Sequence, residues 1–493
     1  MFLVEISMED IMASPKSHTI ELEKIVSLLE RFPLPGGASL FQLIDALAEA
    51  GGQSFLVGGF VRDLFMNREP EDLDIEVFRL SPEELEDIVR SFVPINVVGR
   101  AFSVFKVEGT DIEFSLPRKE SKIGSGHRGF DIRCDPALSF YEASRRRDFT
   151  INAMGVSLSD LSVFDPWNGM VDIANHHLDI VDQSTFSDDP LRVLRASQFL
   201  SRLNFEPSNR LITCSRKMHL EDLPRERIFC EFEKMLLGEK PSRGAEFLVA
   251  TGWIRYFPEW AALIGVPQDP VWHPEGDVWD HTLNALDEAV SLRYGCKRRD
   301  ILLMFGVLCH DFGKAVTTNR RDGRFRSIGH SQAGVYRTET FMKRMTDDKL
   351  LIAGVRKLVG EHLSPQFLYR QGAGPSAIRR LARRLAPELS IEILERCARA
   401  DFRASGVGSV DDFLAGTWLS EQADAHLVRY EPEPPVLMGR HLLEIGLKPG
   451  PHFGIILRRA YEIQLDDGER DKIVLRTRVL NEFNEGILHA DAD

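Results

Sequence analysis

The sequence predicts an α+β protein in which a small mixed α/β domain precedes a long and mostly helical part. In the first part, short apolar runs alternate with one helical stretch, SPEELEDIVRSF, as strands and a connecting helix do. The apolar runs lie at 55–57, 73–78, 94–97, 103–107 and 111–116. From about residue 187 onward, apolar residues recur at i, i+3 and i+4, which is the spacing of amphipathic helices.

The chain is expected to divide into several domains, because 493 residues exceed the size that one hydrophobic core supports. Residues 20–50 predict two amphipathic helices, a second helical block runs from about 278 to 405, and YEPEPPVLMG is a proline-rich linker. Five regions are predicted: an N-terminal helical extension at 1–50, a mixed head at 51–175, a helical neck at 176–270, a second helical domain at 271–405 and a helical tail at 406–493.

The composition is that of an ordinary soluble protein, with 43% hydrophobic and 28% charged residues. The chain has no run of 18 apolar residues, so no membrane span is expected, and the N-terminus does not resemble a secretory signal. Six cysteines are scattered without CxxC spacing, which favours reduced thiols and a cytoplasmic location. The sequence leaves the oligomeric state open.

The formal net charge of −14 argues against a protein that coats nucleic acid non-specifically, since neutralising phosphates needs clustered Lys and Arg. Two local basic stretches remain as candidates for a nucleic-acid groove. They are LPRKESKIGSGHRGF at 116–130 and IRRLARRL at 378–385. For each stretch taken alone, a solvated charged surface is the simpler interpretation.

The first candidate site begins with VGGFVRD and ends with DLD. Asp72 and Asp74 are two residues apart, so on a strand both side chains leave one face, and paired carboxylates suit Mg²⁺. The turn Gly58-Gly59 lets backbone N–H groups approach phosphate oxygens, and Arg62 follows one turn later. The alternative is an ordinary surface DxD after a strand, a turn and a helix.

Three further segments carry polar residues in the same part of the chain. RRRDFTINAMG at 145–155 holds Arg147, Asp148 and Asn152 within two turns, and DPWNGMVDI at 165–173 predicts a glycine-containing turn. DDPLRVLRASQFL at 188–200 opens a helix with Asp189, Arg192 and Arg195 at i, i+3 and i+6.

Six segments, in their order along the chain, resemble class II CCA-adding enzymes (tRNA nucleotidyltransferases) and the related bacterial poly(A) polymerases. These segments are VGGFVRD, DLD, RRDFTINAM, DPWNG, DPLRVLRA and ERIFCEFEKML. The resemblance covers residues 55–236. It implies a nucleotidyltransferase head of the polymerase β type with a mixed sheet, followed by an all-helical, nucleotide-selecting neck. It also implies the following roles: Asp72 and Asp74 as catalytic Mg²⁺ ligands; Gly58, Gly59, Arg62, Asp63, Arg147 and Asn152 as nucleotide-binding residues; Asp148 at the ribose; Asp189 and Arg192 at the base, supported by Arg195; and Glu113 as a candidate third carboxylate.

The pair Asp189 and Arg192 also makes chemical sense by itself. Cytosine and adenine present an amino donor beside a ring-nitrogen acceptor, whereas uracil and guanine present an oxygen acceptor beside an N–H donor. A carboxylate and a guanidinium therefore match CTP and ATP and mispair with UTP and GTP. The alternative for this pair is an i, i+3 salt bridge within the helix.

The resemblance implies addition of CCA to the 3′ end of tRNA from CTP and ATP, with release of pyrophosphate. Three alternatives stay open: a CC-only enzyme, an A-only enzyme and a poly(A) polymerase. Two observations favour full CCA addition. The segment VGRAFSVFKV lacks the basic signature of the poly(A) polymerases, because Ala101 and Lys106 stand at two of its positions. The segment RKESKIGSGHRGF resembles the flexible loop of enzymes that complete the terminal A.

A second constellation in the helical part follows the order H…HD…H…H…D. It consists of His281, His310, Asp311, His330, His362 and Asp401. Such ligands suit a transition metal, namely Mn, Fe, Ni, Co or Zn. The order resembles the HD phosphohydrolase superfamily, whose domain some CCA-adding enzymes carry. The resemblance implies an active phosphohydrolase, and two alternatives remain: a degenerate domain kept for tRNA docking, and HD hydrolysis as the chain's main activity.

Overall fold

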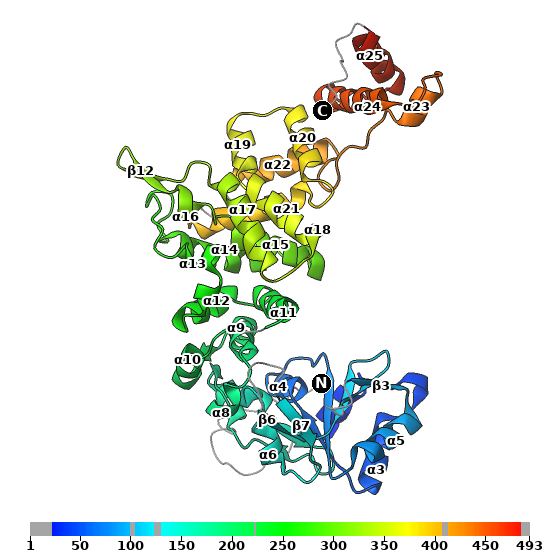
Figure 1. Ribbon diagram of the computed structural model, residues 1–493, viewed down its shortest axis with the longest axis vertical. Coiled ribbons are helices and arrows are strands. Elements are labelled where there is room, and N and C mark those ends of the chain that lie inside the picture. Colours follow the sequence, from blue (N-terminus) through cyan, green and yellow to red (C-terminus); the bar gives the residue numbers. More distant parts are fainter. Residues whose placement is uncertain (1–21, 99–103, 123–129, 221–222, 407–412, 485–493) are drawn as a thin grey trace. The chain divides into compact units, whose positions relative to one another are not determined.

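The computed structural model describes residues 22–98, 104–122, 130–220, 223–406 and 413–484. Two compact units divide the chain, the first from Met1 to Tyr256 and the second from Phe257 to Asp493. The predicted α+β class is confirmed, with a mixed-sheet head near the N-terminus and a large helical part after it (Figure 1). Among the described helices, none has the length and apolar content needed to span a membrane.

The head is built on a seven-stranded sheet with the strand order β3-β4-β5-β2-β1-β8-β9. Only β2 and β5 pair in parallel, and the other neighbours are antiparallel. The strands are β1 (Gln53–Val57), β2 (Leu73–Phe78), β3 (Ile95–Val98), β4 (Val104–Val107), β5 (Ile112–Ser115), β8 (Gly155–Ser157) and β9 (Val163–Phe164). The five apolar runs of the sequence thus correspond to β1 to β5.

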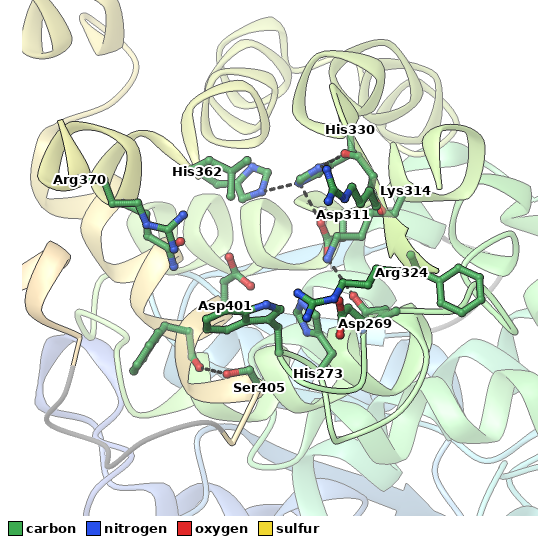
Figure 2. A pocket seen from close by; sticks show the side chains of 18 residues that line it. Asp269, His273, Asp311, Lys314, Arg324, His330, His362, Arg370, Asp401 and Ser405 are labelled. Atoms are coloured by element: carbon green, nitrogen blue, oxygen red, sulfur yellow. Dashed lines mark hydrogen bonds and ion pairs between the residues drawn. The ribbon is translucent and has the colours of Figure 1, made fainter. Parts of the chain in front are cut away.

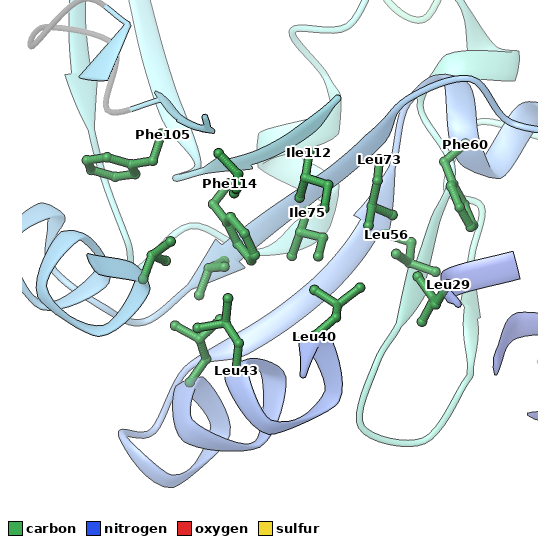
Figure 3. Packing of buried hydrophobic residues seen from close by; sticks show 14 of the residues in the cluster. Leu29, Leu40, Leu43, Leu56, Phe60, Leu73, Ile75, Phe105, Ile112 and Phe114 are labelled. Carbon is green, nitrogen blue, oxygen red and sulfur yellow. The ribbon is translucent and has the colours of Figure 1, made fainter. Parts of the chain in front are cut away.

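Short helices flank this sheet. They are α2 (Leu22–Leu29), α3 (Leu40–Glu49), α4 (Gly59–Phe65), α5 (Pro82–Phe92), α6 (Phe140–Ser144) and α7 (Gly169–Ala174). Helix α5 begins where the sequence predicts, because Ser81 and Glu84 form a capping box at its N-terminus. Figure 3 shows Leu40 and Leu43 of α3 packed on sheet residues such as Ile75, which forms the main core of the head. On the other sheet face, α6 covers a smaller cluster around Phe55.

Part of the basic stretch at 116–130 forms strands of a hairpin, so the stretch is not a loop over its whole length. Strand β6 (Arg118–Lys122) pairs antiparallel with β7 (Phe130–Cys134). The flexible loop is expected at 118–130; its residues 123–129 lie outside the described residues, as does Ala101. At the base of the hairpin, Lys119 forms an ion pair of 2.7 Å with Asp135.

The remainder of the first unit is helical, as the period of its apolar residues predicts. Its helices are α8 (Gln183–Phe186), α9 (Leu191–Leu203), α10 (Asn209–Arg216), α11 (Arg225–Leu236) and α12 (Pro241–Ala250). Helix α9 packs on both α11 and α12. Ten of the thirteen residues of α9 are buried, so its remaining polar side chains share one narrow face. A short parallel pair, β10 (His177–Leu178) with β11 (Glu206–Pro207), completes this part.

The second unit contains the predicted helical block, interrupted by one hairpin. Its main helices are α13 (Pro258–Ala261), α14 (Val278–Val290), α15 (Lys297–Cys309), α16 (Lys314–Thr317), α17 (His330–Lys343), α18 (Lys349–Glu361), α19 (Ser364–Arg370), α20 (Pro375–Leu385), α21 (Ile391–Ala404) and α22 (Leu414–Ala425). The hairpin, β12 (Asn319–Arg321) with β13 (Arg324–Arg326), lies between α16 and α17. The sequence analysis did not predict it.

After the proline-rich linker, three helices form a small core of their own around Leu442, Ile456 and Leu475. These helices are α23 (Gly439–Leu443), α24 (Pro451–Asp467) and α25 (Lys472–Asn484). Helix α24 also packs on α20. The expected helical tail is therefore a folded element that contacts the preceding helices.

Candidate active sites

In the head, two acids meet the glycine turn at one end of the sheet. Asp74 lies on β2 opposite Val57, the last residue of β1, and Asp72 precedes β2 by one residue. A Cβ atom at Gly58 would lie 2.9 Å from Oδ2 of Asp74, and one at Gly59 would lie 3.2 Å from Oδ1 of Asp72. Gly58 also has a φ of 70°. The turn therefore needs glycine, because the backbone passes directly against both carboxylates.

A third acid faces this pair from the neighbouring strand. Glu113 of β5 lies opposite Asp74 in the parallel ladder. Burial, together with the nearby charges of Asp72 and Glu113, raises the pKa of Asp74 to about 7. Three oxygen donors that repel one another are the donor set that a hard divalent cation stabilises, so these residues fit Mg²⁺.

A further acid beside this site, Glu76, was not singled out by the sequence analysis. It lies two positions beyond Asp74 on β2 and its side chain is 1% exposed. Its carboxylate accepts hydrogen bonds from Arg146 (2.8 Å) and Arg147 (3.0 Å). Burial would raise the pKa of Glu76, but the two guanidinium groups hold it below its usual value. The alternation of acids in DLDIEV was the sequence signal for this role.

Through Glu76, Arg147 is fixed beside the glycine turn. Its Nη1 donates to the carbonyl oxygen of Asn152 at 3.1 Å. The same nitrogen would lie 3.6 Å from a Cβ at Gly58. The guanidinium group of Arg147 and the backbone of the glycine turn thus lie next to the carboxylates. Both are hydrogen-bond donors of the kind that a triphosphate bound there would need.

A continuous chain of hydrogen bonds connects five more of the predicted nucleotide-binding residues. Asp63 accepts two bonds of 2.9 Å from Arg62, which is 6% exposed and donates to Asn152 at 3.0 Å. Asn152 donates to Asp148 at 3.1 Å, and Arg195 donates to Asp148 at 2.7 Å. Burial would raise the pKa of Asp148, but Arg195 and other donors lower it. Asp148 is therefore a fixed, ionised acceptor.

The side chains of the predicted base-reading residues do not pair with each other among the described contacts, although the backbone N–H of Arg192 donates to the carbonyl oxygen of Asp189 at 3.0 Å. Asp189 accepts a hydrogen bond from Arg227 of α11 at 3.2 Å. Arg192 donates to the carbonyl oxygens of Thr185 (2.8 Å) and Arg146 (2.7 Å). The alternative, an i, i+3 salt bridge between Asp189 and Arg192, is therefore not found among the described contacts. Arg227, in the segment ERIFCEFEKML, is a second residue that the sequence analysis did not single out.

In the second unit, the six predicted ligands meet; they are called the His/Asp cluster below. They are His281 of α14, His310 and Asp311 at the end of α15, His330 at the start of α17, His362 after α18 and Asp401 of α21. The shortest contacts between these side chains are His281–Asp401 (2.9 Å), His310–Asp311 (3.2 Å), His330–His362 (3.2 Å), His330–Asp311 (3.4 Å) and His281–His310 (3.4 Å). All the contacting histidine atoms are Nε2.

The other ring nitrogen of each histidine is held by a hydrogen bond outside the cluster. Nδ1 of His310, His330 and His362 contacts a backbone carbonyl at 2.6, 2.8 and 2.7 Å. Nδ1 of His281 contacts Glu275 at 2.7 Å. This arrangement fixes the tautomer and turns every Nε2 lone pair inward, as the supporting bonds of metal-ligating histidines do.

The carboxylates of the His/Asp cluster form a site that a bound cation would stabilise. Burial would lower the pKa of His310, but Asp311 and Asp401 outweigh it and raise this pKa to about 10. Both carboxylate oxygens of Asp311 are buried without a well-directed hydrogen bond, although Lys314 lies 2.6 Å from one of them. Asp311 belongs to two groups of three potential ligands, one with His281 and His310 and one with His330 and His362. The donor set fits one or two transition-metal ions.

A cavity of about 660 Å³ opens above the His/Asp cluster. Figure 2 shows Asp311, His330, His362 and Asp401 at its floor, and it shows basic and aromatic side chains along its walls. This volume is within the range of small-molecule sites, about 300–1,000 Å³. Lys314, Glu275 and the cavity walls are parts of the site that the sequence analysis did not name.

The second basic stretch is largely engaged in contacts within the protein. In α20, Arg380 pairs with Asp466 (2.7 Å) and Arg384 pairs with Glu361 (2.8 Å). Arg379 donates to the carbonyl oxygen of Leu465 at 2.7 Å. These arginines attach α20 to its neighbours, and they do not form a free basic surface.

Comparisons with known proteins agree with this architecture. Residues 54–179 match the family model of the poly A polymerase head domain, and residues 210–264 match that of a probable RNA and SrmB-binding site of polymerase A. These two matches cover the carboxylate site and most of the helical neck.

Solved CCA-adding enzymes have the same fold. The complex of a CCA-adding enzyme with ATP is 18% identical, with a TM-score of 0.60 over 96% of this chain and 100% of that chain. The Bacillus stearothermophilus CCA-adding enzyme in complex with CTP is 18% identical, with a TM-score of 0.61 over 90% and 97%. The Thermotoga maritima CCA-adding enzyme complexed with tRNA is 18% identical, with a TM-score of 0.57 over 93% and 98%. The head thus matches the poly A polymerase head family over residues 54–179, and the chain as a whole has the fold of solved CCA-adding enzymes.

Proposed function

We propose that this nucleotidyltransferase adds CCA to the 3′ end of tRNA from CTP and ATP, with Mg²⁺, and releases pyrophosphate. The observation that carries the proposal is the carboxylate site, in which Asp72, Asp74 and Glu113 meet the Gly58-Gly59 turn. The solved relatives of this fold include CCA-adding enzymes bound to ATP, to CTP and to tRNA. All six cysteines are free, which agrees with a reducing, cytoplasmic environment.

In the proposed reaction the 3′ hydroxyl of tRNA attacks the α-phosphate of the nucleotide, and pyrophosphate leaves. Mg²⁺ held by Asp72 and Asp74 would screen the phosphate charges and lower the pKa of the attacking hydroxyl. The backbone of Gly58 and Gly59 and the guanidinium group of Arg147 bind the triphosphate. Positioning of the two reactants supplies much of the remaining rate enhancement.

Selection of the nucleotide is assigned to Asp148 of the head and to two residues of the neck. Asp148 accepts a hydrogen bond from the ribose, and Asp189 and Arg192 bind the Watson–Crick edge of cytosine or adenine. For this, Asp189 must share or release its contact with Arg227. The tRNA is read by the shape and backbone of its acceptor helix, whose narrow major groove hides the base edges.

The test uses purified protein, Mg²⁺ and tRNA that ends before C74, after C74 or after C75. CTP, ATP, UTP and GTP are supplied separately, and CTP is also supplied with ATP. Products are resolved at single-nucleotide length, with D72A/D74A as the control. Growth to a discrete CCA end that needs both nucleotides supports the proposal. Stopping at CC, extension of a CC end alone or a long A-tail would identify the CC-only, A-only or poly(A) alternative.

We propose a second activity for the His/Asp cluster, that of a metal-dependent phosphohydrolase of the HD type. Six potential ligands, four of them buried, and a cavity above them support it; the Nε2 atoms of the four histidines face inward. A transition metal bound there would polarise a phosphoester and supply a nucleophilic water. Chelated protein reloaded with Mn, Fe, Ni, Co or Zn should differ in phosphatase activity, and D311A should lose that activity. If no metal restores hydrolysis, the cluster is a docking element.

A further inference from the structure

Two exposed arginines lie on the cavity wall above the His/Asp cluster. Arg324 begins β13 and Arg370 ends α19, and both line the cavity. Within the described residues, neither guanidinium group has a hydrogen bond or an ion pair. In Figure 2 the two side chains extend inward from opposite sides, with Asp401 between them. A charged group that faces a cavity without a counter-ion is a binding group for an anion.

The other two cations of the cavity are already engaged. Lys314 lies 2.6 Å from Asp311 and donates to Gln268 at 2.8 Å. Arg326 lies 3.9 Å from Asp322 in the same hairpin. Arg324 and Arg370 are therefore the cations of this wall that remain available to a ligand.

The charge balance of the cavity also favours an anion. Its lining has four cationic side chains and three carboxylates, and two of those carboxylates belong to the His/Asp cluster. The third is Asp269, which forms no ion pair with Arg324 within the described residues. A metal ion in the cluster would neutralise Asp311 and Asp401 and leave the walls with an excess of positive charge.

We propose that Arg324 and Arg370 hold the terminal phosphate of a phosphomonoester over the His/Asp cluster, so that this site prefers monoesters to diesters. The inference rests on the proposed phosphohydrolase function. A monoester at neutral pH has three free phosphate oxygens and two charges, whereas a diester has two free oxygens and one charge. The two guanidinium groups, which lie on opposite walls, can bind phosphate oxygens of a monoester while another of its oxygens stays at the His/Asp cluster.

The reaction that follows is a hydrolysis. The oxygen of water forms a bond to phosphorus, and the bond between phosphorus and the ester oxygen breaks. The ester oxygen leaves as an alcohol with one proton of the water, and inorganic phosphate remains. The arginines do not take part in proton transfer; they hold the charge of the group that is attacked.

The first test measures kcat and KM on the full-length, metal-loaded protein with p-nitrophenyl phosphate and with bis(p-nitrophenyl) phosphate. The variants are R324Q and R370Q, and the matched control is R321Q, which removes an equal charge from the exposed partner strand of the same hairpin, outside the cavity. Each cavity variant should raise KM for the monoester about tenfold and change the diester far less. R321Q should match the wild type. Equal changes for both esters, or none, would overturn the inference.

The second test measures binding of inorganic phosphate to the same proteins by isothermal titration calorimetry, which needs no turnover. R324Q and R370Q should weaken binding about tenfold relative to R321Q. If the wild type cleaves neither ester but phosphate binding depends on both arginines, the hydrolase proposal fails and only the assignment of the two arginines to phosphate binding stands. If the wild type cleaves esters and both cavity variants behave like R321Q in both tests, the hydrolase proposal stands and the inference is wrong.

Discussion

The carboxylate site of the head and the His/Asp cluster both gather acids that need a cation, but they assemble them in different ways. In the head, one strand supplies Asp74 and Glu76, and the adjoining turn brings backbone against the carboxylates. In the second unit, the six ligands come from five helices or their ends, and every histidine is oriented by its own supporting bond. The oxygen donors of the head suit Mg²⁺, which keeps coordination positions for substrate phosphates and water. The buried nitrogen donors suit a resident transition metal.

The largest expected effect is the loss of one activity while the other is kept, which tests whether the two sites act independently. D72N/D74N should lower nucleotide addition by at least about a thousandfold, because the ligands of the proposed Mg²⁺ lose their charge. Phosphoester hydrolysis should stay at the wild-type rate. D311N should show the reverse pattern. Both activities are measured on one preparation of each protein, and a loss of both activities in either variant would contradict the independence of the sites.

The next effect concerns the support behind the head site. E76Q removes the charge that pairs with Arg146 and Arg147, and breaking such a buried pair costs about 3 kcal/mol or more of unfolding free energy. The KM for CTP and ATP should also rise, since Arg147 is no longer fixed beside Gly58. Denaturant unfolding and steady-state kinetics check both effects. E83Q, at an exposed position of α5, is the matched control, and an E76Q protein as stable as E83Q would refute the assignment.

A smaller effect is expected at Arg227, which contacts Asp189 across the neck. R227A should reduce the preference for CTP over UTP about tenfold, because the carboxylate that accepts from the base loses its support. R227K keeps a positive charge and should retain more of the preference. The measurement is kcat/KM for single-nucleotide addition with each triphosphate. An unchanged ratio in R227A would mean that Asp189 is positioned by other contacts.

The smallest effect is expected on α20. R380A breaks an exposed ion pair with Asp466 and should cost less than about 1 kcal/mol of stability. Because this arginine is engaged within the protein, affinity for tRNA should hardly change. Filter binding at two salt concentrations checks this point. A strong, salt-dependent loss of tRNA binding would restore the interpretation of this stretch as a nucleic-acid surface.

The sequence predicted the strands and helices of the head well, since their apolar runs have clear periods and Ser81 marks a helix start. It also led to residues that meet in space, such as Asp74 with Glu113 across a ladder. Partners of these residues were harder to find. Glu275 reaches His281 from a loop, and Arg227 reaches Asp189 from another helix, so no local spacing reveals either contact. The β12–β13 hairpin was missed because its strands have only three residues each and contain a single apolar residue, Phe325.

The alternation of side chains along β2 has a consequence for how this head tolerates change. Asp74 and Glu76 share one face, while Leu73, Ile75 and Val77 on the other are completely buried. Inserting or deleting one residue within the strand would exchange the two faces, placing acids in the hydrophobic layer and leucine-type side chains at the site. Such a mutation would abolish folding and catalysis together. Length variation is therefore expected in the segment before Asp72 and never between Asp72 and Glu76.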